Sequence, residues 1–275
     1  MNWPGRSGFN MNRLRDRGHY EIEGVFTLIG LRFQSGTQWR RVSRYLNPLT
    51  RSANNPVCRS GMRKVILCFG DSNTWGFNPE NGERFPAEVR WTGVLQTELG
   101  TGYTIVEEGL NARTTVFDDP VEGTRIDRNG RNHLGILLES HRPIDLVIVM
   151  LGLNDLKCRL AVSAFDIAQG AGELVQIVQC SKSGPQTRAP EILLIAPPPV
   201  KALKELGELF AGAVEKSQNF GQYYARMSQR LGCQFINGAE AAEYDPADGI
   251  HLGAASHATF GRYLATWVRS YFGGS

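Results

Sequence analysis

The sequence of 275 residues lacks long apolar runs, paired cysteines and phosphate-binding glycine motifs. Nothing in it approaches the roughly 18 consecutive apolar residues that a membrane-spanning helix needs. Its five cysteines are scattered and odd in number, so their spacing predicts neither a disulfide framework nor a zinc site. The first predicted strand is not followed by the glycine spacing of a dinucleotide site, and no Gly-Lys-Ser/Thr motif is present. We expect no metal, no cofactor and no membrane partner.

The sequence also has no large excess of positive or negative charge, except at the beginning of the chain. Residues 1–61 contain ten Arg and no Lys against three acidic residues. The remaining residues, 62–275, carry 20 basic and 24 acidic side chains. A mildly acidic body gives no reason to expect a nucleic acid as partner.

Residues 1–61 have no sustained helical or strand period, and we expect a basic, poorly ordered extension or a start that is not the native one. A short apolar segment at 24–31 is separated from the basic start by acidic residues, and no clear cleavage site follows it. We therefore expect a cytoplasmic protein rather than a secreted one. The catalytic body is predicted to begin at residue 62.

The body alternates between strand and helix patterns. Apolar runs predict strands at 65–69, 103–106, 144–151, 191–196 and 233–236. Helical spacing predicts helices at 89–99, 162–180, 204–231 and 256–272. The polar residues 118–132 are predicted to form a loop with solvated charges near the mouth of the site. Alternation of this kind predicts an α/β fold, a parallel five-stranded sheet with helices on both faces.

Small polar residues follow three consecutive predicted strands, where the carboxyl ends of a parallel sheet meet. Gly-Asp-Ser ends in Ser72, Gly-Leu-Asn-Ala ends in Ala112, and Gly-Leu-Asn-Asp contains Asn154. A fourth motif, Asp248-x-x-His251, precedes the last helix. A lone serine here is more often a helix cap, and a lone loop histidine is more often a surface residue. Together these residues could supply a nucleophile, a base, a carboxylate and oxyanion donors.

These motifs, in this order, resemble those of the SGNH hydrolases, the GDSL-type esterases and lipases. Four longer blocks are similar to the arylesterase/acyltransferase branch, which includes a mycobacterial enzyme that transfers acyl groups to alcohols in water. The blocks are Cys-Phe-Gly-Asp-Ser-Asn-Thr-Trp-Gly, Val-Arg-Trp-Thr-Gly-Val-Leu, Glu-Glu-Gly-Leu-Asn-Ala-Arg-Thr-Thr and Asp-Gly-Ile-His. The resemblance spans about 62–275.

The resemblance implies a three-layer, flavodoxin-like fold and a catalytic triad of Ser72, His251 and Asp248. It implies an oxyanion hole formed by the N–H groups of Ser72 and Ala112 and by the side-chain amide of Asn154. Three further residues are expected to support the strand-end loops: Asp71 and Asp155 through hydrogen bonds, and Gly109 at the turn.

Two residues depart from the family pattern. Asn73 stands where the GDSL motif has leucine, and Ala112 stands where many members have glycine. Asn73, Trp75, Phe77 and Trp91 are candidates for the acyl pocket, and the three aromatic residues are equally expected as core packing.

The expected function is a serine esterase that hydrolyses small-acyl, acetyl-like esters through an acyl-enzyme and passes the acyl group to water or to an alcohol. A thioesterase, a carbohydrate deacetylase and a non-catalytic ligand-binding module remain alternatives. By analogy with the relatives we expect a homo-oligomer, with residues 118–132 and 200–220 packing between subunits.

Overall fold

Five parallel strands form the centre of the fold, as the sequence predicted. The structure is a computed structural model and describes residues 63–273. The sheet has the order β2-β1-β3-β4-β5, and every neighbouring pair is parallel. The strands are β1 (Lys64–Gly70), β2 (Tyr103–Gly109), β3 (Leu146–Met150), β4 (Glu191–Ala196) and β5 (Gln234–Asn237).

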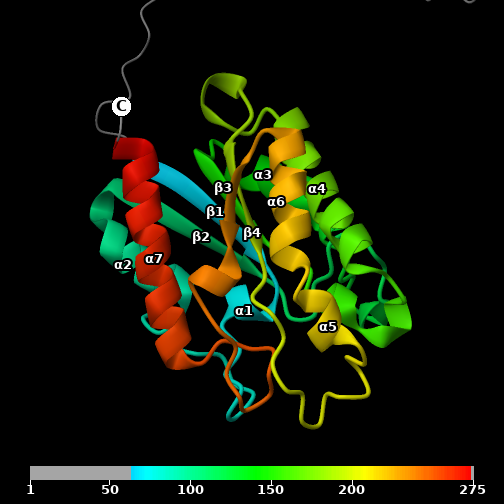
Figure 1. Ribbon diagram of the computed structural model, residues 1–275. Helices are drawn as coiled ribbons and strands as arrows, with labels where there is room; N and C mark the ends of the chain where they lie inside the picture. Colours follow the sequence, from blue (N-terminus) through cyan, green and yellow to red (C-terminus); the bar gives the residue numbers. More distant parts are fainter. Residues whose placement is uncertain (1–62, 274–275) are drawn as a thin grey trace, which may run out of the picture. The chain divides into compact units, whose positions relative to one another are not determined.

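Helices cover both faces of this sheet, which confirms the predicted three-layer α/β architecture (Figure 1). On one face lie α2 (Trp91–Leu99) and α7 (Ala254–Gly273). On the other lie α3 (Gly130–His141), α4 (Ala164–Cys180) and α6 (Phe220–Leu231). All five residues of β3 are buried, as expected for an apolar strand between two helical layers.

The register of the central strands places the ends of three strands side by side. Gly70, the last residue of β1, pairs with Gly109 of β2 and with Met150 of β3. The segments that leave these strands therefore meet at one edge of the sheet, next to the short helices α1 (Ser72–Trp75) and α5 (Ala213–Ser217). Open α/β folds hold their sites at this edge.

The prediction of one long helix over 204–231 was wrong. Turns occupy much of residues 204–212, and two separate helices follow, α5 and α6. Gly212 precedes α5 with a φ of 77°, a left-handed conformation that interrupts a helix and that glycine adopts without strain.

The structure also contains a helix that the sequence pattern did not predict. Residues 130–132 were assigned to the polar loop, but α3 begins at Gly130, where the Asn129 side chain accepts a hydrogen bond from Arg131 N–H at 3.0 Å. Leu134 and Leu138 of α3 pack in the core. Two glycines and several polar residues dilute this short apolar stripe in the sequence. In α7 the side chains of Phe260, Leu264 and Val268 pack in the core, whereas Tyr263 is 38% exposed.

Among residues 63–273 no helix is long and apolar enough to cross a membrane. The predictions made for residues 1–61 concern a part of the chain outside the described residues.

Candidate active site

The sharp turn after β1 carries Ser72. Gly70 ends the strand, and a Cβ there would lie 2.0 Å from Thr74 Oγ1, so the turn closes only around glycine. The Asp71 carboxylate caps α1 by accepting a hydrogen bond from Asn73 N–H at 2.9 Å. Ser72 is the first residue of α1, and its Oγ lies 2.8 Å from His251 Nε2.

The other imidazole nitrogen of His251 faces Asp248. Asp248 Oδ2 lies 2.6 Å from His251 Nδ1, and Asp248 Oδ1 accepts hydrogen bonds from the N–H groups of Ile250 and His251, both at 3.0 Å. Burial raises the pKa of Asp248, but the hydrogen bond and charge of His251 and the two backbone N–H groups outweigh it and lower the pKa below its ordinary value. The ionised carboxylate orients Nδ1–H toward itself, which leaves Nε2 as the acceptor that faces Ser72.

Ala112 and Asn154 lie on the wall of the same cavity as Ser72. Asn154 Nδ2 donates to the Arg113 carbonyl at 3.2 Å, which fixes the direction of the amide. Ala112 has a φ of 63°. This left-handed conformation costs about 1–2 kcal/mol for a residue with a Cβ, and glycine would adopt it freely. The backbone therefore accepts Ala112 where many family members have glycine, at the cost of local strain.

Two buried carboxyl groups, those of Asp71 and Asp155, form hydrogen bonds within or between the strand-end loops. Asp155 accepts a hydrogen bond from Thr115 N–H at 3.0 Å and one from Thr115 Oγ1. Burial raises the pKa of Asp155 to about 7, although its hydrogen bonds with Thr115 oppose the shift. Burial likewise raises the pKa of Asp71 to about 6, against the opposing effect of Asn73 N–H and of the positive charges of His251 and Arg113.

The reason predicted for Gly109, a need of the turn, was wrong. Its φ is not among the positive values of this chain, so the turn itself does not require glycine. A Cβ at Gly109 would lie 2.1 Å from the backbone nitrogen of Trp75. Gly109 is needed because α1 packs directly against the end of β2.

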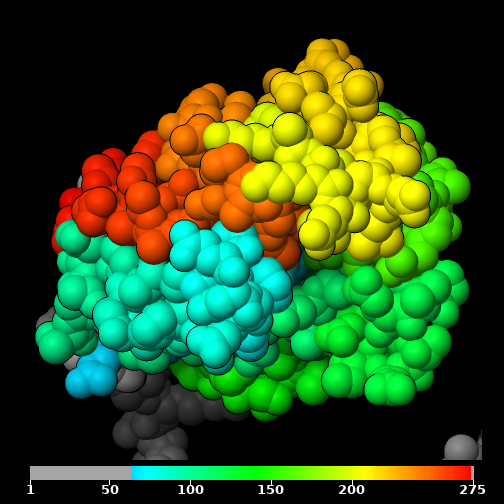
Figure 2. Space-filling model, turned by 90° about the horizontal axis from the view of Figure 1, so that it is seen from below, coloured from blue at the N-terminus to red at the C-terminus, as the bar shows by residue number. Residues whose placement is uncertain are grey.

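A cavity of about 570 Å³ opens beside Ser72. Figure 2 looks onto this face of the protein, where segments from four parts of the chain surround a hollow. Leu206, Leu209 and Phe210 form an apolar part of the cavity lining. Asn111 and Glu122 contribute polar or charged side chains to the same cavity. A cavity of this size accommodates a small-molecule substrate.

Of the four pocket candidates, the structure places only Phe77 on the cavity wall. Trp91 is 1% exposed and packs edge-on against Phe260, with ring centroids 5.4 Å apart. The Trp75 ring lies against the guanidinium of Arg84. Asn73 is buried and forms hydrogen bonds with the backbone beside His251. Asn73 and Trp75 belong to α1 and Trp91 begins α2, and the side chains of all three contact other parts of the protein instead of lining the cavity.

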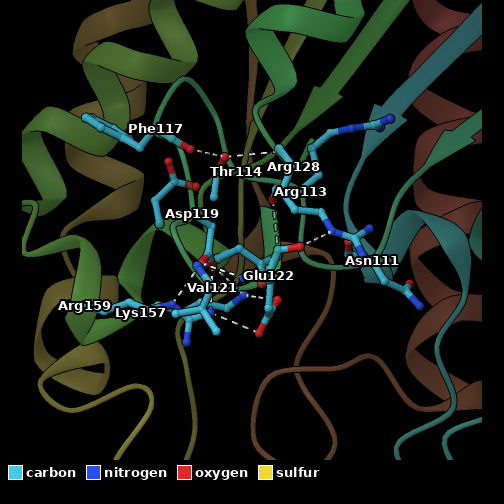
Figure 3. A network of polar contacts seen from close by, with 12 residues as sticks. Asn111, Arg113, Thr114, Phe117, Asp119, Val121, Glu122, Arg128, Lys157 and Arg159 are labelled. Atoms are coloured by element: carbon cyan, nitrogen blue, oxygen red, sulfur yellow. Dashed lines mark hydrogen bonds and ion pairs between the residues drawn. The ribbon is translucent and has the colours of Figure 1, made fainter. Parts of the chain in front are cut away.

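The charges of residues 118–132 are not all solvated, contrary to the prediction. Figure 3 shows the network of ion pairs that joins Asp119 and Glu122 to Lys157 and Arg159. The Asp119 side chain is 0% exposed and that of Lys157 is 2% exposed. Lys157 Nζ lies 2.6 Å from Glu122 Oε2, and Arg159 Nη2 lies 2.7 Å from Asp119 Oδ2. Burial raises the pKa of Asp119, but hydrogen bonds from Arg159 and from backbone N–H groups, with the charge of Lys157, hold it well below its usual range.

This network joins the loop before α3 to the segment that carries Asn154, and both Glu122 and Lys157 line the cavity. The sequence shows the acidic and the basic residues of this network but gives no signal that they pair, because the partners are separated by 35 to 40 positions. Arg113 was also missed: it is 4% exposed and its Nη1 donates to the Gly70 carbonyl at 2.8 Å, between the ends of β1 and β2. Its place in the Asn-Ala-Arg motif was the available signal. Within residues 63–273, no three His, Cys, Asp or Glu side chains are grouped to hold a metal ion.

Comparison with known proteins places this site in a family. Residues 68–259 match the GDSL-like Lipase/Acylhydrolase family. Est24, a carbohydrate acetylesterase from Sinorhizobium meliloti, is 38% identical, with a TM-score of 0.72 over 76% of this chain and 100% of that chain. The aryl esterase of M. smegmatis is 40% identical, with a TM-score of 0.71 over 75% of this chain and 99% of that chain. No curated protein matches the chain significantly. This chain therefore belongs to the SGNH, or GDSL-like, lipase/acylhydrolase family near its arylesterase branch, and is a carboxylic ester hydrolase.

Proposed function

We propose that this protein is a serine esterase that cleaves small-acyl esters through a covalent acyl-enzyme on Ser72. The observation that carries the proposal is the continuous chain of contacts from Ser72 Oγ to His251 Nε2, at 2.8 Å, and from His251 Nδ1 to Asp248, at 2.6 Å. A nucleophile within hydrogen-bond reach of a base, which a carboxylate orients in turn, is the arrangement that activates a serine.

In the first half of the reaction, Ser72 Oγ attacks the ester carbonyl carbon while His251 Nε2 accepts the hydroxyl proton. The tetrahedral oxyanion then collapses, the ester C–O bond breaks, and His251 returns the proton to the leaving alcohol. In the second half, a water molecule gives a proton to His251 and attacks the acyl-enzyme. The bond between the acyl group and Ser72 Oγ then breaks, His251 returns the proton to Ser72 Oγ, and the acid is released. An alcohol in place of water would complete an acyl transfer instead.

The oxyanion donors in this proposal are the N–H groups of Ser72 and Ala112 and the side-chain amide of Asn154. Their common place on the cavity wall supports the assignment. One amide hydrogen of Asn154 is engaged by the Arg113 carbonyl, and the amide carries a second one for the substrate. Losing one such donor typically lowers kcat by about 10²–10³-fold.

The composition of the cavity wall supports small-acyl substrates. A long acyl chain would have to lie near charged side chains on that wall, among them Glu122, Lys157 and Lys204. Contact between apolar chains and charged groups that need hydration is unfavourable. The apolar wall formed by Leu206, Leu209 and Phe210 offers room for an acetyl-like group or for the apolar part of an alcohol.

The test is the hydrolysis of p-nitrophenyl acetate, butyrate and octanoate by the wild type, by Ser72→Ala and by Ser163→Ala. Ser163 caps α4, far along the chain from the triad, and is the matched control for a serine that serves only as a helix cap. We expect rates that fall with chain length, that vanish in Ser72→Ala and that persist in Ser163→Ala. Equal rates for wild type and Ser72→Ala would remove Ser72 from the mechanism and favour a binding module.

A carbohydrate deacetylase is a second candidate, because the cavity wall includes polar groups and Est24 is a carbohydrate acetylesterase. Acetate release from acetylated sugars, compared with that from p-nitrophenyl acetate and an acetyl thioester, separates the three substrate classes. Adding a primary alcohol to the same assay and measuring the new ester separates acyl transfer from hydrolysis.

A further inference from the structure

The side-chain amide of Asn73 forms hydrogen bonds with both residues that flank His251. Asn73 Nδ2 donates to the Ile250 carbonyl at 3.1 Å, and Asn73 Oδ1 accepts from Leu252 N–H at 2.9 Å. Asn73 is 2% exposed, and both partner residues are buried as well. The amide thus matches one donor and one acceptor of the backbone on either side of the histidine, out of reach of competing water.

Asn73 is equally well fixed at its own end. It follows Ser72 directly in α1, and its N–H donates to the Asp71 carboxylate at 2.9 Å. One short side chain therefore connects the backbone of the nucleophile to the backbone of the base, across a sequence separation of 177 to 179 positions.

Asp248 does not make this connection. It lies three residues before His251 in the same loop, and its carboxylate bonds to the imidazole and to the N–H groups of Ile250 and His251. It orients the ring within the loop but does not bind the loop to α1. Within the part of the chain that the structure describes, the hydrogen bonds between α1 and residues 245–253 are the two from Asn73 and the Ser72–His251 contact itself.

We propose that Asn73 is a positioning residue of the reaction: its amide sets the separation between Ser72 Oγ and His251 Nε2. The proposal rests on the triad of the proposed function and adds a residue that does not touch the substrate or the reacting atoms. A leucine of similar size, the residue of the GDSL motif, would leave the Ile250 carbonyl and the Leu252 N–H without these partners. The loop would then be free to move away from Ser72, and a displacement of about 1 Å typically costs about 10²-fold in rate.

The experiment compares kcat and KM of the full chain for p-nitrophenyl acetate in the wild type, Asn73→Leu, Asn73→Asp and Gln96→Leu. Gln96 is the matched control, because its amide also bridges backbone groups, donating to the Tyr103 carbonyl at 3.2 Å and accepting from Ile105 N–H at 2.9 Å. Those groups lie at the beginning of β2, away from the strand ends that carry the site.

We expect Asn73→Leu to lower kcat by about 10²-fold with KM changed less than about threefold, and Gln96→Leu to keep the wild-type kcat. Asn73→Asp adds a pH readout. Its carboxylate repels the Ile250 carbonyl, whereas its protonated form restores a donor and an acceptor. We therefore expect its activity relative to the wild type to recover as the pH falls from 8 to 6. A merely structural role would not produce that recovery. If Asn73→Leu does not fold, the pH profile of Asn73→Asp decides in the same way.

A wild-type kcat in Asn73→Leu, an equal loss in Gln96→Leu, or a pH-independent ratio for Asn73→Asp would overturn the proposal. Ser72→Ala, measured alongside, distinguishes a failure of the proposed triad from a failure of the positioning role of Asn73. An active Ser72→Ala would remove the triad on which the proposal rests. An inactive Ser72→Ala with a fully active Asn73→Leu would leave the triad in place and remove only the positioning role.

Discussion

The phenyl ring of Phe77 lies over the imidazole of His251, with ring centroids 4.3 Å apart and an angle of 30° between the planes. Phe77 N–H donates to the Ser72 carbonyl at 3.0 Å, so the ring is held by the same turn that carries the nucleophile. The face of an aromatic ring attracts a cation. In the proposed mechanism, Phe77 is thus placed to stabilise the imidazolium that forms when Ser72 loses its proton.

We predict that Phe77→Leu lowers kcat by at least about two- to fivefold, because a cation–π contact contributes about 0.5–1 kcal/mol even at an exposed site, and His251 is buried. Leucine keeps most of the apolar volume on the cavity wall but has no aromatic face. Phe77→Tyr keeps that face and is expected to retain the wild-type kcat. Steady-state kinetics with p-nitrophenyl acetate measure both, and equal kcat values for Leu and Tyr at this position would refute the interpretation.

We predict that Asp248→Asn lowers kcat by about 10⁴-fold, with little change in KM. The amide cannot accept the Nδ1–H bond as a carboxylate does, so the imidazole loses the tautomer that leaves Nε2 free to accept the Ser72 proton. Kinetics at pH 8 measure the effect. Asp245→Asn is the control: that carboxylate accepts a hydrogen bond from Ala247 N–H at 2.8 Å in the same loop, without contacting His251 through its side chain. A comparable loss in both variants would assign the effect to the loop.

A buried histidine between α2 and α7 makes stability depend on pH. His257 is 0% exposed, and its Nδ1 accepts a hydrogen bond from Trp91 N–H at 3.2 Å. Burial, helped by the positive charges of Arg90 and His251, lowers the pKa of His257 to about 3. Below pH 6.5 the unfolded chain binds a proton at this residue that the folded protein does not. The free energy of unfolding therefore falls by about 1.4 kcal/mol per pH unit from this group as the pH falls toward 3.

His257→Gln removes that titration and keeps an acceptor for Trp91 N–H. Urea unfolding at pH 7, 5.5 and 4.5 should show the variant gaining stability relative to the wild type as the pH falls, with the slope just given. The raised pKa values of Asp71 and Asp155 act in the opposite direction, but both proteins contain them and the difference isolates His257. Parallel curves for the two proteins would contradict the prediction.

The buried ion pairs beside the cavity should contribute more to stability than a surface pair. We predict that Lys157→Met lowers the free energy of unfolding by about 3–5 kcal/mol, because Asp119 and Glu122 lose a buried positive charge. Lys201→Met, which removes a pair with Glu243 whose side chains are 37% and 75% exposed, should cost less than about 1 kcal/mol. Equal losses in urea unfolding would show that the buried network has no special role.

Because the pKa of Asp119 is lowered, the stabilisation that this network provides depends on pH in the acidic range. The stabilisation is fully present above the ordinary pKa of an aspartate and is lost as the pH falls below it. In Lys157→Met this acid sensitivity should be smaller than in the wild type, because less of the interaction remains to be lost.

The fold and the proximity of Ser72, Asp248 and His251 could be predicted from the sequence because local patterns carry them. An apolar run that stops at glycine and small polar residues predicts a buried strand and the residues at its end. Parallel strands bring such ends to one edge, so the sequence predicts that Ser72, Ala112 and Asn154 converge, and in the structure all three line one cavity. Asp248 and His251, three residues apart, were expected to meet because their spacing is local.

Other features were decided only by the tertiary structure, because they depend on contacts between distant segments. The roles of Asn73 and Gly109 follow from what lies opposite them, the backbone beside His251 and the nitrogen of Trp75. Whether an aromatic residue lines the cavity or packs in the core depends on the direction in which a short helix points it. The pairing of Asp119 with Lys157 and Arg159 likewise has no local signal, since charges separated by 38 and 40 positions attract only once the fold has brought them together.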